Sequence, residues 1–225
     1  MIPGQRIGYL NFSLGISWLL ILLLIQLSSA YSLKSPLLQR KSSFAIKKFL
    51  LQHSIIPEGI AEAPRYLVEV RYTRDCFINL GNKVDPATVQ RRPRFIFYPS
   101  ANDTYYTLVL LDLDVPTRSN PIYRDRQHWL LVNIPGHNWT LGETLTEYLG
   151  PIAPRDSGLH RYLFIVYQQP AKLDFNEKKI LATDRQFREG HVRSGFNIEK
   201  FAEKYNFGSP YAANFFLTGW PLDQE

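Results

Sequence analysis

The chain has 225 residues, of which 45% are hydrophobic and 14% aromatic, and its formal net charge at pH 7 is +6. This composition excludes collagen-like, low-complexity and disordered chains and allows one domain with a substantial core. The basic residues are scattered in short pairs, so we expect no nucleic-acid partner. The one cysteine, Cys76, cannot form an internal disulfide, and we expect it to be a small buried hydrophobic residue.

Residues 1–30 have the pattern of a secretory signal peptide. Arg6 is their only charge, residues 16–27 (ISWLLILLLIQL) form an apolar run, and residues 28–30 (SSA) suit cleavage by signal peptidase. The run is too short to span a bilayer comfortably, and an uncleaved membrane anchor is the alternative. We therefore expect a secreted, extracellular protein in which residues 31–225 form a single domain. It should be a monomer with at most peripheral membrane contact.

The part of the chain after the signal peptide is predicted to begin with an amphipathic helix over residues 44–52 (FAIKKFLLQ). Its apolar residues recur at helical spacing after Ser42 and Ser43, whose hydroxyls suit a helix cap. Pro57 and Pro64 then predict an extended segment.

Strands dominate the remainder of the sequence. The predicted strands are residues 66–72, 95–98, 105–113, 128–134 and 160–167. Residues 140–149 predict a short helical turn at most, and Asn197 caps a predicted helix over residues 198–206. Because strands and helices do not alternate, the sequence predicts a mainly β, two-layer antiparallel architecture with peripheral helices.

Three polar side chains stand at the ends of predicted strands, namely Asp112, His128 and His160. Asp114 follows Asp112 by two residues, so in a regular strand both point to one face. Pro116 marks the end of that strand, and we expect one of the two carboxylates to be structural. A lone buried histidine is usually a satisfied core residue, but two histidines with one aspartate favour a shared site.

Strand alternation also predicts the neighbours of each histidine. Leu130, Val132 and Ile134 should share the face of His128, and Tyr162 and Phe164 should share the face of His160. Both imidazoles are therefore expected in an apolar wall.

Three kinds of chemistry fit two imidazoles and one carboxylate. They can be ligands of a metal with open coordination positions. They can also form an anion site, in which imidazole N–H groups and backbone N–H groups near Gly150 donate and Asp112 fixes a tautomer. Nucleophilic catalysis needs an activated serine or cysteine. Only residues 156–158 (DSG) offer one, and we interpret this match as chance because the flanking residues of serine proteases are missing.

Two longer motifs resemble the phosphatidylethanolamine-binding protein family, which includes the Raf kinase inhibitor protein. Residues 112–118 (DLDVPTR) are similar to its Asp-Pro-Asp-Ala-Pro-Ser-Arg signature, and residues 156–162 (DSGLHRY) to its Gly-(Thr/Ser)-Gly-Leu-His-Arg-Tyr signature. Between them, Tyr123, Arg124, His128 and residues 132–136 (VNIPG) follow the family's order and spacing, and the similarity extends from about residue 56 to Trp220. With its signal peptide, the chain resembles a secreted animal member.

The resemblance implies a central antiparallel sheet flanked by a smaller sheet and by helices, with a surface pocket for phosphate-like anions. It also implies a cis bond between Val115 and Pro116. The residues that it places at the pocket are Asp112, His128, His160, Pro116, Tyr123, Gly150 and Tyr162. Arg126 stands where the family usually has tryptophan, so an aromatic wall is replaced by a cation that either binds phosphate or points to solvent.

The function that we expect is that of a non-enzymatic binding protein for phospholipid head groups or other phosphorylated small molecules, without a cofactor. The alternative is a protein-interaction inhibitor of a serine protease or a signalling kinase. A metal-dependent hydrolase is a third hypothesis, for which no further ligand follows a metal-site spacing. Asn102 and Asn138 lie in glycosylation sequons.

Overall fold

The computed structural model of the protein describes residues 41–151, 153–181 and 191–220. The predicted signal peptide lies outside these ranges and stays a prediction. Within them, no helix has the length and apolar character needed to cross a membrane. In chain order the elements are α2 (Ser43–Gln52), α3 (Ile55–Glu58), β1 (Tyr66–Leu67), β2 (Glu69–Arg71), β3 (Asn82–Lys83), β4 (Phe95–Phe97), β5 (Tyr105–Asp112), β6 (Arg126–Pro135), η1 (Trp139–Leu141), β7 (Glu143–Thr146), β8 (His160–Gln168), η2 (His191–Arg193), α5 (Ile198–Lys204) and β9 (Ala212–Thr218).

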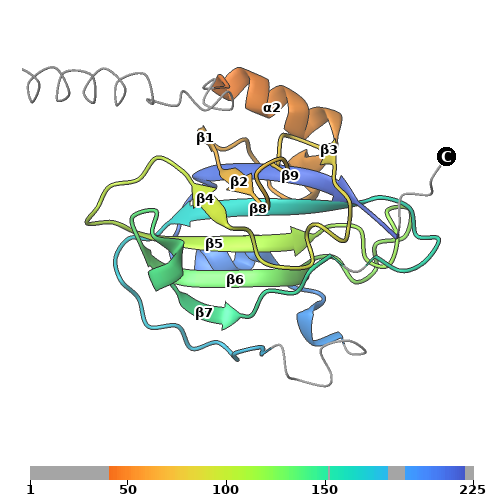
Figure 1. The fold of residues 1–225 in the computed structure, drawn as a ribbon. Coiled ribbons are helices and arrows are strands. Elements are labelled where there is room, and N and C mark those ends of the chain that lie inside the picture. Colours follow the sequence, from red (N-terminus) through yellow and green to blue (C-terminus); the bar gives the residue numbers. More distant parts are fainter. Residues whose placement is uncertain (1–40, 152, 182–190, 221–225) are drawn as a thin grey trace, which may run out of the picture. The chain divides into compact units, whose positions relative to one another are not determined.

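These strands form one large and one small sheet (Figure 1). The large sheet has seven strands in the order β1-β9-β8-β5-β6-β7, with β3 also paired to β9. Strands β5 to β9 pair antiparallel, whereas β1 and β3 run parallel to β9. Strands β2 and β4 form the small antiparallel sheet. The predicted fold class, mainly β with peripheral helices, is confirmed.

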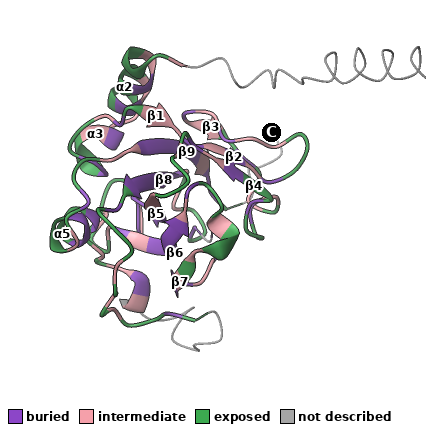
Figure 2. Ribbon diagram, turned by 90° about the vertical axis from the view of Figure 1, so that its left-hand side faces the viewer, coloured by how far each residue is buried: buried purple, intermediate pink, exposed green. Residues whose placement is uncertain are grey.

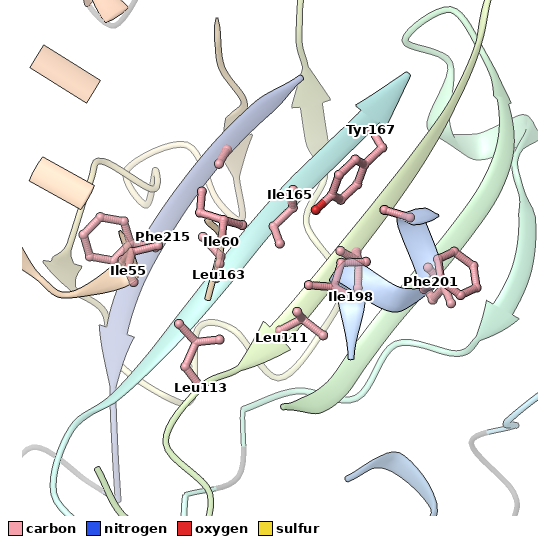
Figure 3. Packing of buried hydrophobic residues seen from close by; sticks show 14 of the residues in the cluster. Ile55, Ile60, Leu111, Leu113, Leu163, Ile165, Tyr167, Ile198, Phe201 and Phe215 are labelled. Atoms are coloured by element: carbon pink, nitrogen blue, oxygen red, sulfur yellow. The ribbon is translucent and has the colours of Figure 1, made fainter. Parts of the chain in front are cut away.

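Each face of the large sheet carries its own hydrophobic core. Val109 and Leu111 of β5 belong to the core under the helices, whereas Leu108 and Leu110 belong to the core under the small sheet. Figure 2 shows α2, α3 and α5 on one side of the sheet and β2 and β4 on the other. Figure 3 shows the helix-side core, which includes Ile198 of α5. Because both faces are covered, the middle of strand β5 is apolar on both sides, from Leu108 to Leu111.

Both predicted amphipathic helices are confirmed, and each has the expected cap. Oγ of Ser42 accepts a hydrogen bond from the backbone N–H of Ala45 at 3.2 Å, which caps α2. Oδ1 of Asn197 accepts from the N–H of Lys200 at 2.8 Å, which caps α5.

The segment around Pro57 forms a helical turn, so the prediction of a fully extended segment was wrong. Pro57 lies in the first turn of α3, where its missing N–H costs no hydrogen bond. Ile56 before it does keep an extended conformation (φ −100°, ψ 124°), as residues before proline usually do. A hydrogen bond of 2.8 Å from Gly59 N to the carbonyl of Ile55 closes the turn, and the buried Ile55 side chain anchors it.

Two further predictions of secondary structure were wrong. Residues 66–72 form two strands, because the chain leaves β1 in the large sheet and enters β2 in the small one. Residues 140–149 hold one short helical turn, η1, but continue into β7, whose pairing with β6 the sequence did not predict. Strand β9 was also missed, although it lies between β8 and β1.

Cys76 is half-buried, so the prediction that it is buried was wrong. Burial of this extent raises the pKa of its thiol.

Candidate functional site

The polar residues predicted to form a site meet at one edge of the large sheet. Strand β5 ends at Asp112, β6 begins at Arg126 and β8 begins at His160. In the sheet ladder Asp112 is paired with Arg126 on one side and with Tyr162 on the other. Paired residues of antiparallel strands present their side chains on one face. These side chains therefore share the face toward the small sheet, where Tyr162 joins the core.

Asp112 and His160 form a buried ion pair. Nδ1 of His160 lies 2.9 Å from Oδ2 and 3.1 Å from Oδ1 of Asp112, and the two side chains expose 0% and 1% of their surface. Burial alone lowers the pKa of His160, but the hydrogen bond to Asp112 and its charge outweigh burial and raise that pKa above its ordinary value. The backbone of Pro116 acts in the same direction, which places Pro116 beside this ring.

The other ring nitrogen of His160 is held by Ser157. Nε2 lies 2.9 Å from Oγ of Ser157, and this Oγ donates its hydrogen to the carbonyl of Pro154 at 2.7 Å. A serine hydroxyl has a single hydrogen, so Oγ must accept from Nε2–H. With Nδ1–H donated to Asp112, His160 carries both hydrogens and is an imidazolium ion. In a catalytic triad the histidine must be neutral to take the serine proton, so this arrangement does not activate Ser157.

His128 reaches the same face through a β-bulge. The register of β5 against β6 shifts by one residue there, which interrupts the alternation of β6. The His128 ring packs edge to face against Tyr162, with the ring centroids 5.1 Å apart. Leu130 and Val132 pack in the helix-side core instead, whereas Ile134 packs in the core under the small sheet. The prediction that His128 shares a face with Leu130 and Val132 was wrong because the bulge cannot be read from the sequence pattern.

The hydrogen bonds of His128 define its protonation. Nδ1 lies 2.9 Å from the carbonyl of Leu149, which only accepts, so Nδ1 carries a hydrogen. Burial, with smaller contributions from the charges of Arg126 and Arg193, lowers the pKa of His128 to about 4, although the Asp112 carboxylate acts in the opposite direction. The ring is therefore neutral at pH 7. Its Nε2 is an acceptor that is buried and has no hydrogen-bond partner among the described residues.

Tyr162 contributes a second buried polar atom. Its ring lies between His160 and Phe216, with centroid distances of 6.4 and 5.3 Å. The hydroxyl makes no well-formed hydrogen bond within the part of the chain that the structure describes. Burial and the nearby Asp112 carboxylate raise the pKa of Tyr162 well above its ordinary value. The hydroxyl therefore stays protonated, with the Asp112 carboxylate beside it.

Because Gly150 has no side chain, its backbone packs directly against Gln90, next to the Leu149 carbonyl that binds His128. A Cβ atom at Gly150 would lie 2.6 Å from Cα of Gln90, so a larger residue would push the two segments apart. Nε2 of Gln90 also donates to the carbonyl of Pro151 at 2.8 Å. These contacts fix the segment whose Leu149 carbonyl orients the His128 ring.

Tyr123 lies at the rim of the site rather than in its buried centre. It is 37% exposed, and its backbone N–H donates to the carbonyl of Val115 at 3.0 Å. The bond between Val115 and Pro116 is cis, as the resemblance implied.

The second carboxylate of the motif, Asp114, is structural, as expected for one of the pair. Its Oδ1 and Oδ2 accept hydrogen bonds from Nη2 and Nε of Arg161 at 2.5 and 2.9 Å. His160 and Arg161 are neighbours on β8 and point to opposite faces, so their two carboxylate partners also lie on opposite faces. The prediction that Asp112 and Asp114 share a face was wrong because β5 ends at Asp112 and its alternation stops there.

The donors of the site differ from those expected. Three imidazole N–H groups donate to Asp112, Ser157 and the Leu149 carbonyl, so neither histidine has an N–H left for an anion. What the cluster offers a ligand is the Tyr162 hydroxyl, the Nε2 acceptor of His128 and the positive charge of Arg126. Ser157 and Leu149 were not predicted as site residues, because their roles depend on loop conformation.

Among the described residues, no three His, Cys, Asp or Glu side chains gather in an arrangement that could hold a metal.

Comparisons with known proteins agree with this fold. The sequence model described as "Phosphatidylethanolamine-binding protein" matches residues 71–216. The chain is 38% identical over 175 residues to the putative odorant-binding protein A5 of Drosophila melanogaster, covering 78% of this chain and 80% of that protein. It is 34% identical to the 26 kDa secreted antigen of Toxocara canis over 74% of this chain and 61% of the antigen.

Solved structures show the same fold. The carboxypeptidase Y inhibitor in complex with its cognate proteinase aligns with a TM-score of 0.65 and 23% identity over 78% of this chain and 95% of the inhibitor structure. The phosphatidylethanolamine-binding protein from Plasmodium vivax aligns with a TM-score of 0.57 and 19% identity over 80% of this chain and 98% of that structure. At these identities the likeness concerns the fold alone.

Proposed function

Because the chain belongs to the phosphatidylethanolamine-binding protein family, we propose that it is a secreted, non-enzymatic binding protein for phosphorylated ligands. The ligand is a phospholipid head group or a small phosphorylated molecule, held beside Asp112, His128, His160 and Tyr162. The observation that carries the proposal is the buried His128 Nε2, which has no partner among the described residues, together with the buried Tyr162 hydroxyl beside Asp112. Buried polar atoms are nearly always paired, so such atoms at a sheet edge favour a ligand or bound water.

The electrostatics of the cluster support an anionic ligand. The charge of Asp112 is balanced by the imidazolium of His160. Arg126 occupies the neighbouring ladder position and acts on both His128 and Tyr162 as a positive charge. An anion of the size of a phosphate group adds negative charge where cations are in excess.

An enzymatic function finds no support in this geometry. Ser157 stands next to His160 but faces an imidazolium, which cannot act as a base toward it. The relatives are named as odorant-binding protein, antigen and inhibitor, which fits a protein that binds rather than converts its ligand.

Secretion is proposed from residues 1–30 and agrees with the name of the Toxocara canis relative. Asn102 and Asn138 are both exposed, as carriers of glycans must be. N-terminal sequencing of protein from the culture medium tests the cleavage after residue 30. Loss of mass on treatment with an N-glycosidase, absent in an Asn102→Gln, Asn138→Gln variant, tests the two sequons.

Isothermal titration with phosphoethanolamine tests the binding site. We expect wild-type protein to bind, and a variant with His128→Ala and His160→Ala to lose binding. Because both imidazoles are buried, Tyr162→Phe serves as a milder variant that removes one oxygen only. His137→Ala is the matched control, since His137 is exposed and lies beyond the far end of β6. Equal binding by wild type and all site variants would refute the assignment of the site.

The same preparation tests protease inhibition, which is the alternative function. The likeness to the carboxypeptidase Y inhibitor concerns the fold, so it gives no residues for such a role. A panel of serine proteases assayed with and without the protein decides between the two. Inhibition that survives the Tyr162→Phe and His160→Ala changes would place an inhibitory surface elsewhere on the molecule.

A further inference from the structure

The site presents a hydrogen-bond acceptor where an anion would need a donor. The carbonyl of Leu149 forces the hydrogen of His128 onto Nδ1, which leaves a lone pair on Nε2. This Nε2 is buried and has no partner among the described residues. A phosphate oxygen without a hydrogen would meet this lone pair with its own, which is repulsive. The ligand atom at Nε2 must therefore bring a hydrogen.

Protonation of Nε2 would turn this acceptor into a donor, but the groups around His128 oppose it. The titratable or charged groups that face it from the surrounding elements are Asp112 on β5, Arg126 on its own strand, Tyr162 on β8 and Arg193 before α5. Two of these are cations, the ring is fully buried, and the nearest carboxylate is already paired with His160. Together they keep the ring neutral over the range in which most ligands bind.

Phosphate esters differ in their ability to supply the hydrogen. A phosphomonoester has its second pKa near 6, so close to neutral pH a good fraction carries one P–O–H group. A phosphodiester, which is the form of an intact phospholipid head group, has no hydrogen on any phosphate oxygen. The hydroxyl of Tyr162 can at the same time donate to a second oxygen of the ligand.

We propose that the site selects phosphomonoesters over phosphodiesters, with a P–O–H group of the bound monoanion donating to Nε2 of His128. This inference rests on the proposed function and names its ligand class. The Asp112–His160 pair is neutral as a whole, and Arg126 at the neighbouring ladder position supplies positive charge for the remaining phosphate oxygens. The favoured ligand is then a free phosphorylated small molecule rather than a lipid embedded in a bilayer.

Isothermal titration of the wild-type protein with two soluble probes tests the proposal. Phosphoethanolamine is the monoester, and glycerophosphoethanolamine is the diester with the same amine. At pH 6 we expect the monoester to bind about tenfold more tightly or better, since a site built around a buried hydrogen bond rejects ligands that cannot complete it. Above pH 6 its affinity should fall by up to about tenfold per pH unit, because the ligand must regain a proton.

Proton uptake gives a second readout of the same event. Titrations at pH 7.5 in two buffers of different ionisation enthalpy should show close to one proton taken up per monoester bound, because the dianion then dominates. At pH 5 the uptake should approach zero. In a His128→Leu variant the two probes should bind alike and the uptake should vanish, while the His137→Leu control keeps both.

The outcomes separate the inference from the function on which it rests. If neither probe binds the wild-type protein, both the proposed function and the inference fail. If both probes bind equally, or the diester binds more tightly, the anion site stands and the selection is wrong. Tight monoester binding without proton uptake at pH 7.5 also overturns the proposal. Should the His128→Leu variant fail to fold, the comparison of two probes on wild type still decides.

Discussion

Nδ1 of His160 contacts both oxygens of Asp112, at 2.9 and 3.1 Å, and joins the first residue of β8 to the last residue of β5. The pair is buried on both sides, so its two charges depend on each other. It also leaves Nε2 as the donor to Ser157, which fixes the loop before β8. One ion pair thus sets the charge of the site and the path of its neighbouring loop.

The first prediction concerns the charge of His160. In an Asp112→Asn variant the pKa of His160 should fall below its wild-type value, because burial then acts without its counterion. In wild type the raised pKa stabilises the fold below pH 6.5, and this contribution is lost as the pH rises through the folded-state pKa. NMR titration of the imidazole Cε1–H signals measures the change, with the exposed His137 as internal control. An unchanged His160 titration would contradict the pairing.

The long central strands of the large sheet could be predicted from the sequence. Residues 105–113 and 160–167 are long apolar runs, and β5 and β8 lie where these runs predicted them. Strand β9 was missed because Ala212 and Ala213 begin it, and two alanines give no strand signal, although both are buried against β8. Neighbouring strands, not local propensity, decide that this segment is extended.

The site was predicted only in part, for a different physical reason. The motif residues Asp112 and His160 identify the pair, since their roles depend on strand ends that the sequence marks. The orientation of His128 depends on a bulge, and its tautomer depends on the Leu149 carbonyl, 21 residues away in sequence. Such features arise from sheet register and loop geometry, which no local pattern of residue types encodes.

The second prediction concerns the buried Arg161. Its guanidinium donates to Asp114, to Glu58 and to the carbonyls of His53 and Ser54, which ties β8 to the chain between α2 and α3. Arg161→Met should lower the free energy of unfolding by about 3–5 kcal/mol, since the buried Asp114 loses its short hydrogen bonds to the guanidinium and keeps the longer contact of 3.6 Å to Arg124. Chemical denaturation measures the loss.

A paired substitution separates the lost ion pair from lost packing. The double variant Arg161→Met, Asp114→Leu should recover part of the stability, because no carboxylate is left unpaired in the core. If the double variant is less stable than Arg161→Met alone, the ion pair was not the source of the effect.

The third prediction concerns His128 and acid stability. Its pKa of about 4 in the folded protein lies below the ordinary value of 6.5. Between these two pH values the unfolded chain therefore binds a proton at this residue, whereas the folded protein does not. The contribution of His128 to stability should therefore fall as the pH is lowered from 6.5 toward 4, by an amount on the order of 3 kcal/mol in full. His128→Leu should remove this contribution, so the difference in stability between wild type and the variant should change with pH. Urea denaturation at pH 4.5, 5.5 and 6.5 measures the slope, and an unchanged slope would show that His128 is solvated.

The fourth prediction concerns Asp125. Its contribution to stability falls as the pH rises from about 4 to 7, whereas that of His128 rises. Burial raises the pKa of Asp125 to about 7, and its Oδ1 has no partner among the described residues. The folded protein thus holds a proton that the unfolded chain releases above about pH 4, so this contribution is present at low pH and lost as the pH rises toward 7. Asp125→Asn should raise stability at pH 8 by on the order of 2 kcal/mol, because no buried charge then forms.

The contributions of Asp125 and His128 to stability change with pH in opposite directions, so the Asp125→Asn and His128→Leu variants test each other. Between pH 4.5 and 6.5 the two groups offset each other in wild type, so its stability should change little. Asp125→Asn should expose the His128 slope, with stability rising with pH, and His128→Leu should expose the Asp125 slope, with stability falling with pH. Additivity is tested by the double variant, which should again be nearly flat because both titrations are gone. Slopes of the same sign in both single variants would mean that at least one of these groups is not buried in the folded protein.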